Sequence, residues 1–141
     1  MQKIRTMIFI LVTVLFVSGN VFAQTEQEQR IRTAYMLAFG RDANSGELTY
    51  WKGRGDLSIS QLLSFHQQYL GQNDNEHRLT INRAYVDAMG RNATAAEINY
   101  WKGRGNDTYS ALMKNHIQWL QANPAEYQLS IVRSYLAVLG K

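Results

Sequence analysis

The chain has 141 residues, no cysteine, and 15 basic against 11 acidic residues, a formal net charge of +4. Without cysteine no disulfide can stabilise the fold, so apolar packing must do so. Two basic residues, Lys3 and Arg5, belong to a predicted leader, and without them 13 basic and 11 acidic residues remain, a net charge of +2. That balance is too small to indicate a nucleic-acid-binding surface, and no nucleic acid is expected among the partners.

Residues 1–23 have the features of a secretory signal peptide. Lys3 and Arg5 precede an apolar stretch from Met7 to Val17, and the small residue Ala23 stands where cleavage is expected. The apolar stretch is well short of the roughly 20 residues that a membrane-spanning helix needs. The sequence therefore predicts cleavage near Ala23 and a periplasmic or secreted mature chain without a membrane span.

The sequence contains an internal repeat. Residues 31–80 align with residues 81–130 without a gap and are identical at 22 of 50 positions, including the hexapeptide YWKGRG. A third, partial copy begins at residue 131. This self-similarity predicts one domain, residues 24–141, made of two tandem repeats of about 50 residues and a capping helix at 131–141.

The first helical pattern of each copy is amphipathic. Apolar residues fall at i, i+3, i+4, i+7 and i+8 from Ile31, and the same spacing recurs from Ile81 and, with a serine at i+3, from Ile131. This spacing places them on one face of a helix. Gly40 and Gly90 follow at the position where a left-handed cap ends a helix. Because no segment alternates with a period of two over the length of a strand, the predicted fold is all-α.

Two further helices are expected in each repeat. Asn44 with Glu47, and Thr94 with Glu97, have the spacing of a capping box that begins a short second helix. A third helix is expected after the glycines of YWKGRG. Each full repeat is therefore predicted to contain three helices.

Seven side chains on these apolar faces are predicted to form the structural core. Two of them are histidines, which could also be metal ligands. Each lies in an apolar stripe without a second His, Cys or carboxylate at ligand spacing, so a buried histidine with one hydrogen bond fits better. No metal or cofactor is expected. The predicted core residues are Tyr35, Trp51, His66, Tyr85, Trp101, His116 and Tyr135.

A motif that occurs in both repeats resembles a known signature. Its residues in the first repeat are Tyr35, Phe39, Gly40, Arg41, Asn44, Leu48, Tyr50 and Trp51, and the second repeat has the same pattern from Tyr85 to Trp101. The pattern resembles the Y-x-x-x-L-G-R-x-P-D-x-x-G-L-x-Y-W signature of a bacterial domain family of unknown function, whose members are exported and often occur in tandem. The resemblance implies an all-α fold and export, and it supplies no catalytic residues. The aspartate of the signature is Asn44 or Thr94 here, which keeps its helix-capping role.

Glu47 and Glu97 form the candidate carboxylate pair for acid–base hydrolysis of a glycan. Their capping-box positions explain them without chemistry. Catalytic pairs are also usually asymmetric, because one acid must be protonated and the other ionised. No catalytic residue is therefore predicted, and the protein is expected not to be an enzyme.

The two Lys-Gly-Arg-Gly loops are the candidate ligand site. Helix capping does not require the repeated cations, and the neighbouring glycines would let backbone N–H groups approach a phosphate or carboxylate. The alternative is that the cations only solvate a helix end. The predicted ligand-binding residues are Lys52, Arg54, Lys102 and Arg104.

Two functions follow from these observations. The first is an exported, non-enzymatic helical repeat module that binds another exported protein or assembles at the cell surface. The second is a protein that binds carbohydrate or an anionic cell-wall polymer through the two KGRG loops.

Overall fold

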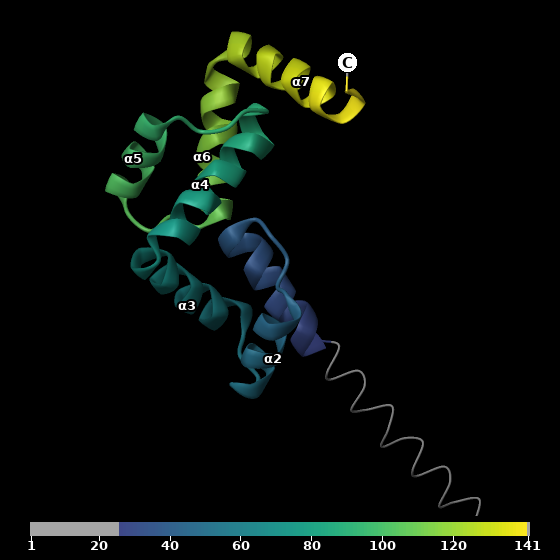
Figure 1. The fold of residues 1–141 in the computed structure, drawn as a ribbon, viewed down its shortest axis with the longest axis vertical. Helices are drawn as coiled ribbons and strands as arrows, with labels where there is room; N and C mark the ends of the chain where they lie inside the picture. The colour runs from purple at the N-terminus through teal and green to yellow at the C-terminus, as the bar shows by residue number, and fades with distance from the viewer. Residues whose placement is uncertain (1–25, 141) are drawn as a thin grey trace, which may run out of the picture.

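The computed structural model describes residues 26–140, and every regular element in that range is an α-helix (Figure 1). The predicted all-α fold class is confirmed for this range, whereas the predicted signal peptide and its cleavage site lie outside it. None of the helices in residues 26–140 has the length and apolar character needed to cross a bilayer. The chain is helical over residues 26–39, followed by α2 (Ser45–Gly53), α3 (Ile59–Gln72), α4 (Asp74–Met89), α5 (Ala95–Arg104), α6 (Tyr109–Ala122) and α7 (Pro124–Leu139).

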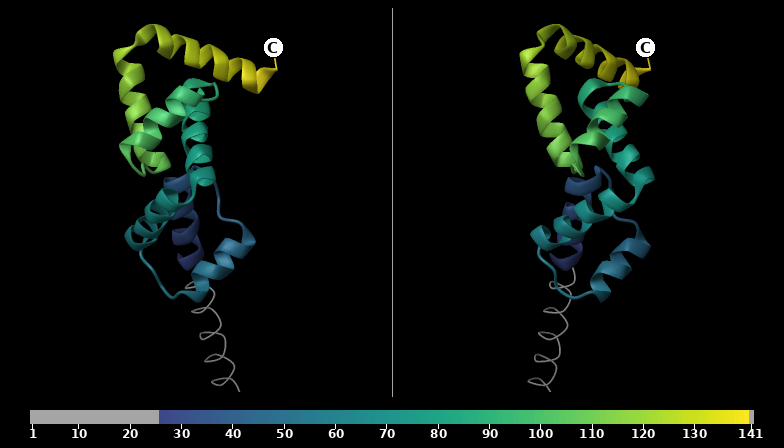
Figure 2. Two further views of the ribbon diagram at one scale, coloured as in Figure 1. Left: turned by 60° about the vertical axis from the view of Figure 1, so that its left-hand side comes forward. Right: turned by 90° about the vertical axis from the view of Figure 1, so that its left-hand side faces the viewer.

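The helices form two halves that meet at α4. The helix of residues 26–39 lies with α2 and α3 in one half, and α4 lies with α5 and α6 in the other (Figures 1 and 2). Helix α4 packs against α3, α5, α6 and α7. Helix α7 crosses the end of the second half that lies opposite the first half (Figures 1 and 2).

Each half has its own apolar core. In the first half Ile31 and Leu62 are deeply buried, and Ile81 and Leu112 are their counterparts in the second half. The cores lie where the first long helix, the short helix and the second long helix of each half meet, because those three helices contribute the apolar stripes. Six of the seven predicted core residues are buried: Tyr35, Trp51, His66, Tyr85, Trp101 and His116.

The structure contradicts the predicted core at Tyr135, which is exposed. Tyr35 and Tyr85, which hold the same position in the repeat, are 5% and 6% exposed, whereas Tyr135 is 67% exposed. No described helix covers the corresponding face of α7, so the prediction that Tyr135 lies in the core is wrong.

Local sequence signals set the helix ends. Gly40 and Gly90 have φ of +68° and +66°, the left-handed conformation that glycine adopts without strain. The side chains of Asn44 and Thr94 cap α2 and α5, and Glu47 and Glu97 complete both capping boxes. The predicted caps are thus confirmed.

The predicted repeat boundaries fall inside helices. Helix α4 begins at Asp74 and continues past residue 80, and α7 begins at Pro124 and continues past residue 130. Arg83 of α4 donates to the carbonyl of Phe39 at 2.9 Å, and Arg133 of α7 donates to the carbonyl of Met89 at 3.3 Å. Arg83 therefore satisfies a carbonyl at the C-terminal end of the helix of residues 26–39, and Arg133 does the same for α4.

Candidate functional site

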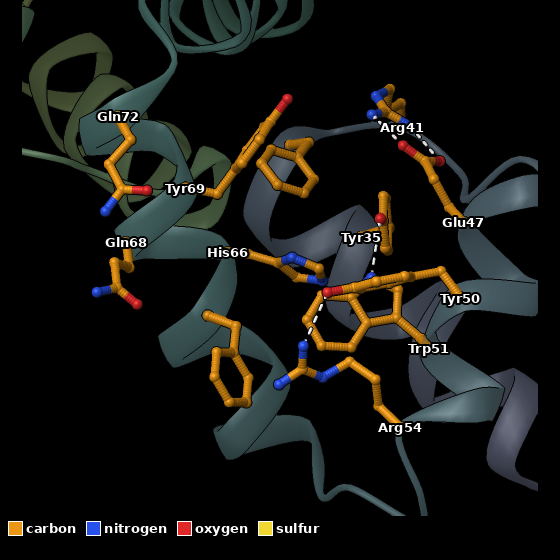
Figure 3. A pocket seen from close by; sticks show the side chains of 12 residues that line it. Tyr35, Arg41, Glu47, Tyr50, Trp51, Arg54, His66, Gln68, Tyr69 and Gln72 are labelled. Carbon is orange, nitrogen blue, oxygen red and sulfur yellow. Dashed lines mark hydrogen bonds and ion pairs between the residues drawn. The ribbon is translucent and has the colours of Figure 1, made fainter.

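The two halves contain equivalent pockets, one of about 440 Å³ and one of about 430 Å³. Both volumes lie in the range of about 300–1,000 Å³ that is usual for small-molecule sites. The residues that line the first pocket come from three helices and from the ends of the loops that follow the first two of them (Figure 3). Seven positions with the same residue type line both pockets: Tyr35 and Tyr85, Arg41 and Arg91, Glu47 and Glu97, Tyr50 and Tyr100, Trp51 and Trp101, Arg54 and Arg104, and His66 and His116.

A buried aromatic cluster forms the floor of the first pocket. The indole Nε1 of Trp51 donates a hydrogen bond to the hydroxyl of Tyr35 at 3.0 Å. The ring of His66 meets Tyr35 edge-on at 4.5 Å and Trp51 edge-on at 5.1 Å between centroids (Figure 3). Such edge-to-face contacts hold aromatic rings in defined orientations. The floor is therefore rigid before any ligand binds.

An arginine–glutamate pair closes one side of each pocket. Arg41 donates two hydrogen bonds to Glu47, at 2.8 and 2.9 Å, and Arg91 makes the same pair of bonds to Glu97. Burial works to raise the pKa of Glu47, but the bonds from Arg41 and from the Asn44 backbone hold it below its usual value. The hydrogen bonds from Arg91 lower the pKa of Glu97 to about 2. Both carboxylates are therefore ionised at neutral pH, and both accept hydrogen bonds from groups of the protein itself.

The second arginine of each pocket has a different environment. Arg54 donates to the hydroxyl of Tyr50 at 2.8 Å, and its guanidinium lies 5.4–5.8 Å from the ring centroids of Tyr50, Trp51 and Phe65. No carboxylate among residues 26–140 pairs with it. The guanidinium is held over aromatic faces at the pocket rim, and its charge stays available to a ligand.

The two lysines of the KGRG motifs do not belong to the pockets. Lys52 pairs with Glu28 at 2.6 Å, and Lys102 pairs with Asp74. Neither lysine lines either of these two pockets. The four cations predicted to act together are thus divided: the lysines join the short helices to the long ones, and only the arginines reach the site.

The two pocket histidines are buried and neutral. His66 and His116 are each 2% exposed, and the Nε2 of each has no hydrogen-bond partner among the described residues. The predicted single hydrogen bond is therefore not present at that atom. Burial lowers the pKa of His66 to about 4 and lowers the pKa of His116. Within residues 26–140 no group of three or more His, Cys, Asp or Glu side chains is arranged to hold a metal ion.

The two pockets differ at their rims. Phe65 and Tyr69 of the first pocket correspond to Asn115 and Trp119 of the second. Because Asn115 replaces an aromatic ring, Arg104 lies over two rings, Tyr100 and Trp101, rather than three. Sequence analysis did not identify these rim positions, because His66 and His116 were the only residues of the third helices to which it assigned a role.

Helix α7 presents a second candidate surface. Its residues Ile131, Tyr135, Val138 and Leu139 line an open apolar groove and are 46%, 67%, 83% and 53% exposed. Only Ser130 of this helix is buried. The groove contains no charged residue.

Comparisons with known proteins add no relative. No family model, no curated protein and no solved structure matches this chain.

Proposed function

We propose that this chain is an exported, non-enzymatic helical repeat module that assembles with another protein through α7. In this proposal residues 31–80 and 81–130 are two tandem three-helix repeats, and α7 includes the first helix of a third copy. A single observation carries it: the apolar face of α7 is exposed where the same face of the two equivalent helices is buried.

The comparison is made position by position. Ile131 is 46% exposed, whereas Ile31 and Ile81 are 2% and 0% exposed. Leu139 is 53% exposed, whereas its equivalent Met89 is 3% exposed. Contiguous apolar surface of this kind on a soluble domain indicates an interface.

The two buried faces indicate what the partner supplies. In each half the face is covered by a short helix whose tryptophan donates to the tyrosine hydroxyl, and by a long helix whose histidine packs on the same ring. A partner with a helix pair like α5 and α6 would supply both contacts to Tyr135. Because the groove on α7 is uncharged, packing would decide the association. The resemblance to a family whose domains often occur in tandem agrees with such a partner.

The glutamates support a non-enzymatic role. Each accepts two hydrogen bonds from an arginine and a further bond from the backbone N–H of the helix cap, so Glu47 and Glu97 are held as ionised structural groups. Glycoside hydrolysis needs one carboxyl group that stays protonated near neutral pH. Neither glutamate meets that need.

A completed third copy tests the proposal. Residues 92–122, which contain α5 and α6, are added as a second copy after Lys141, whose position corresponds to Arg91. We expect the added helices to cover α7, to raise the unfolding temperature, and to reduce binding of a dye that reports exposed apolar surface. The matched control carries Ala in place of the added copy's equivalent of Trp101, and its unfolding temperature should rise much less. Equal unfolding temperatures for both extended chains and the original chain would contradict the proposal.

A photo-reactive amino acid in place of Tyr135 would test in cells whether a partner protein binds α7. The proposal expects a crosslink to a protein segment with a tryptophan-bearing short helix followed by a longer helix. The same probe at the exposed position Gln128, outside the groove, is the control. Equal capture at both positions would show that α7 has no specific partner.

A further inference from the structure

The two pockets have no role in assembly through α7, and their composition indicates a ligand of their own. We propose that each pocket binds a sugar ring that carries one carboxylate, so that one chain holds two acidic saccharide units. The argument rests on the charge of the pocket, the rings and amides that line it, and the way its residues are held.

Charge defines the anionic group. In the first pocket Arg41 and Glu47 neutralise each other, and His66 is neutral because its pKa is lowered by burial. Arg54 remains, with a hydrogen bond only to a neutral phenol among the described residues. One free guanidinium matches one carboxylate, whereas a phosphate monoester carries nearly two negative charges and is usually held by several cations.

The walls of the pocket match a sugar ring. Tyr50, Phe65 and Tyr69 are 55%, 39% and 46% exposed, so their faces are open to a ligand beside the buried Trp51. The C–H face of a pyranose packs against such rings, while amide side chains bond its hydroxyls. Gln68 and Gln72 supply amides on the α3 side of the same pocket (Figure 3).

The arginine is held in place before binding. Arg54 lies over three aromatic rings and bonds to the Tyr50 hydroxyl at 2.8 Å, and Arg104 makes the same bond to Tyr100 at 2.8 Å. A preorganised donor loses little conformational entropy when a ligand arrives. A cation that only solvated a helix end would not need this repeated arrangement.

The histidine at the floor provides an independent indication. His66 is 98% buried, points from α3 toward Tyr35 and Trp51, and leaves its Nε2 unpartnered among the described residues (Figure 3). An apolar residue would pack at this position without the cost of an unpartnered polar atom. His116 is buried in the same way on the floor of the second pocket, and its Nε2 is also unpartnered among the described residues.

The tryptophans offer a direct measurement. All three tryptophans of the chain, Trp51, Trp101 and Trp119, line the pockets, so their fluorescence reports on these sites. The purified mature chain is titrated with D-glucuronate and D-galacturonate, with the uncharged sugars glucose and galactose, and with acetate and inorganic phosphate. We expect saturable binding of at least one uronate with two sites per chain, the first pocket being the tighter because of Phe65. Neutral sugars, acetate and phosphate should bind at least tenfold more weakly.

Matched variants of the KGRG motif locate the site. Arg54→Gln should remove one of the two sites, and Arg54→Gln with Arg104→Gln should weaken uronate binding at least tenfold at both. Lys52→Gln with Lys102→Gln makes the same change of charge in the same motifs but outside the pockets, and should leave the affinity within about twofold. Unfolding temperatures of all variants show whether each is folded.

Each other outcome overturns the proposal. Equal binding of neutral sugars would show that the carboxylate is not recognised, and equal binding of acetate or phosphate would show a simple anion site. If the double lysine variant and the double arginine variant lost the same uronate affinity, the loss would follow from net charge rather than from contacts in the pockets. No fluorescence change and no nuclear magnetic resonance shift with any of these probes would remove the saccharide assignment, while leaving assembly through α7 intact.

Discussion

Trp101 of α5 donates a hydrogen bond from its indole Nε1 to the hydroxyl of Tyr85 on α4 at 3.0 Å. Both side chains are buried, and burial raises the pKa of Tyr85. The short helix α5 has only two buried residues, Ile98 and Trp101. This bond therefore fixes how the short helix sits on the long one.

Loss of the Tyr85 hydroxyl should destabilise the fold. Tyr85→Phe leaves the indole N–H buried without a partner, which costs about 1–3 kcal/mol of unfolding free energy. Trp101→Ala also creates a cavity and should cost about 3–5 kcal/mol. Urea unfolding measures both changes. Tyr135→Phe is the control, because that residue is exposed and should change the free energy little; an equal effect of Tyr85→Phe and Tyr135→Phe would contradict the bond's role.

The buried histidines should make stability depend on pH. His66 has its pKa lowered from 6.5 to about 4, so between these values the unfolded chain binds a proton that the folded chain does not. Stability is therefore complete above pH 6.5 and is lost as the pH falls towards 4, by up to about 3 kcal/mol for this residue. The pKa of His116 is lowered by burial too, and adds to the loss in the same direction.

Unfolding temperatures between pH 7.5 and pH 4 would show this slope. His66→Gln removes the titrating group and should flatten the curve relative to the unmodified chain. The pKa of Glu97 is lowered to about 2, so Glu97 titrates below this range and does not mask the effect. An unchanged slope in His66→Gln would assign the pH dependence to other groups.

Substitution of Gly103 and of Gly90 by alanine should change the unfolding free energy in opposite directions. Gly103 lies inside α5, and a Cβ there would meet nothing within 4 Å. Gly103→Ala should raise the unfolding free energy by about 0.5–1 kcal/mol, because alanine is favoured in helices. Gly90 has φ of +66° and a Cβ there would overlap Arg133, so Gly90→Ala should destabilise by more than about 1 kcal/mol. Thermal unfolding compares the two, and a destabilising Gly103→Ala would indicate a steric role in the motif.

The capping glutamates should act on stability rather than on any reaction. Glu97→Gln removes the charge paired with Arg91 and weakens the capping box of α5, and should cost about 1–2 kcal/mol. The pKa of Glu97 is lowered to about 2, so its contribution is complete above the usual value of 4.5 and is lost as the pH falls towards 2. The unfolding free energy of Glu97→Gln should therefore depend less on pH between 4.5 and 2 than that of the original chain. A variant as stable as the original chain at pH 7 would contradict this role.

Local rules explain what the sequence could predict. The caps at Gly90 and Thr94 and the inward positions of Trp101 and His116 follow from the spacing of residues in one segment. The contact between Tyr50 and Arg54 could also have been predicted, because residues four apart on a helix are neighbours. This spacing would have predicted different environments for the arginines and the lysines of the motif.

Contacts between distant segments could not be predicted in this way. Lys52 pairs with Glu28, 24 residues away, because α2 packs on the helix of residues 26–39. The pocket rim depends in the same way on how α3 is turned toward α2, which sets the exposure of Phe65 and Tyr69. Tyr135 was misassigned because its pattern matches that of Tyr85, and a pattern does not show which helix covers it.

Helix α4 has a consequence for cooperativity. Its first turn carries Glu76, which pairs with Arg41 of the first half and with Arg83, while its apolar face forms the core of the second half. Loss of either half therefore breaks contacts of the other, as nearest-neighbour coupling does in repeat proteins. The slowest amide hydrogens of α3 and α6 should exchange with solvent at one common opening free energy, because the two halves open in a single event.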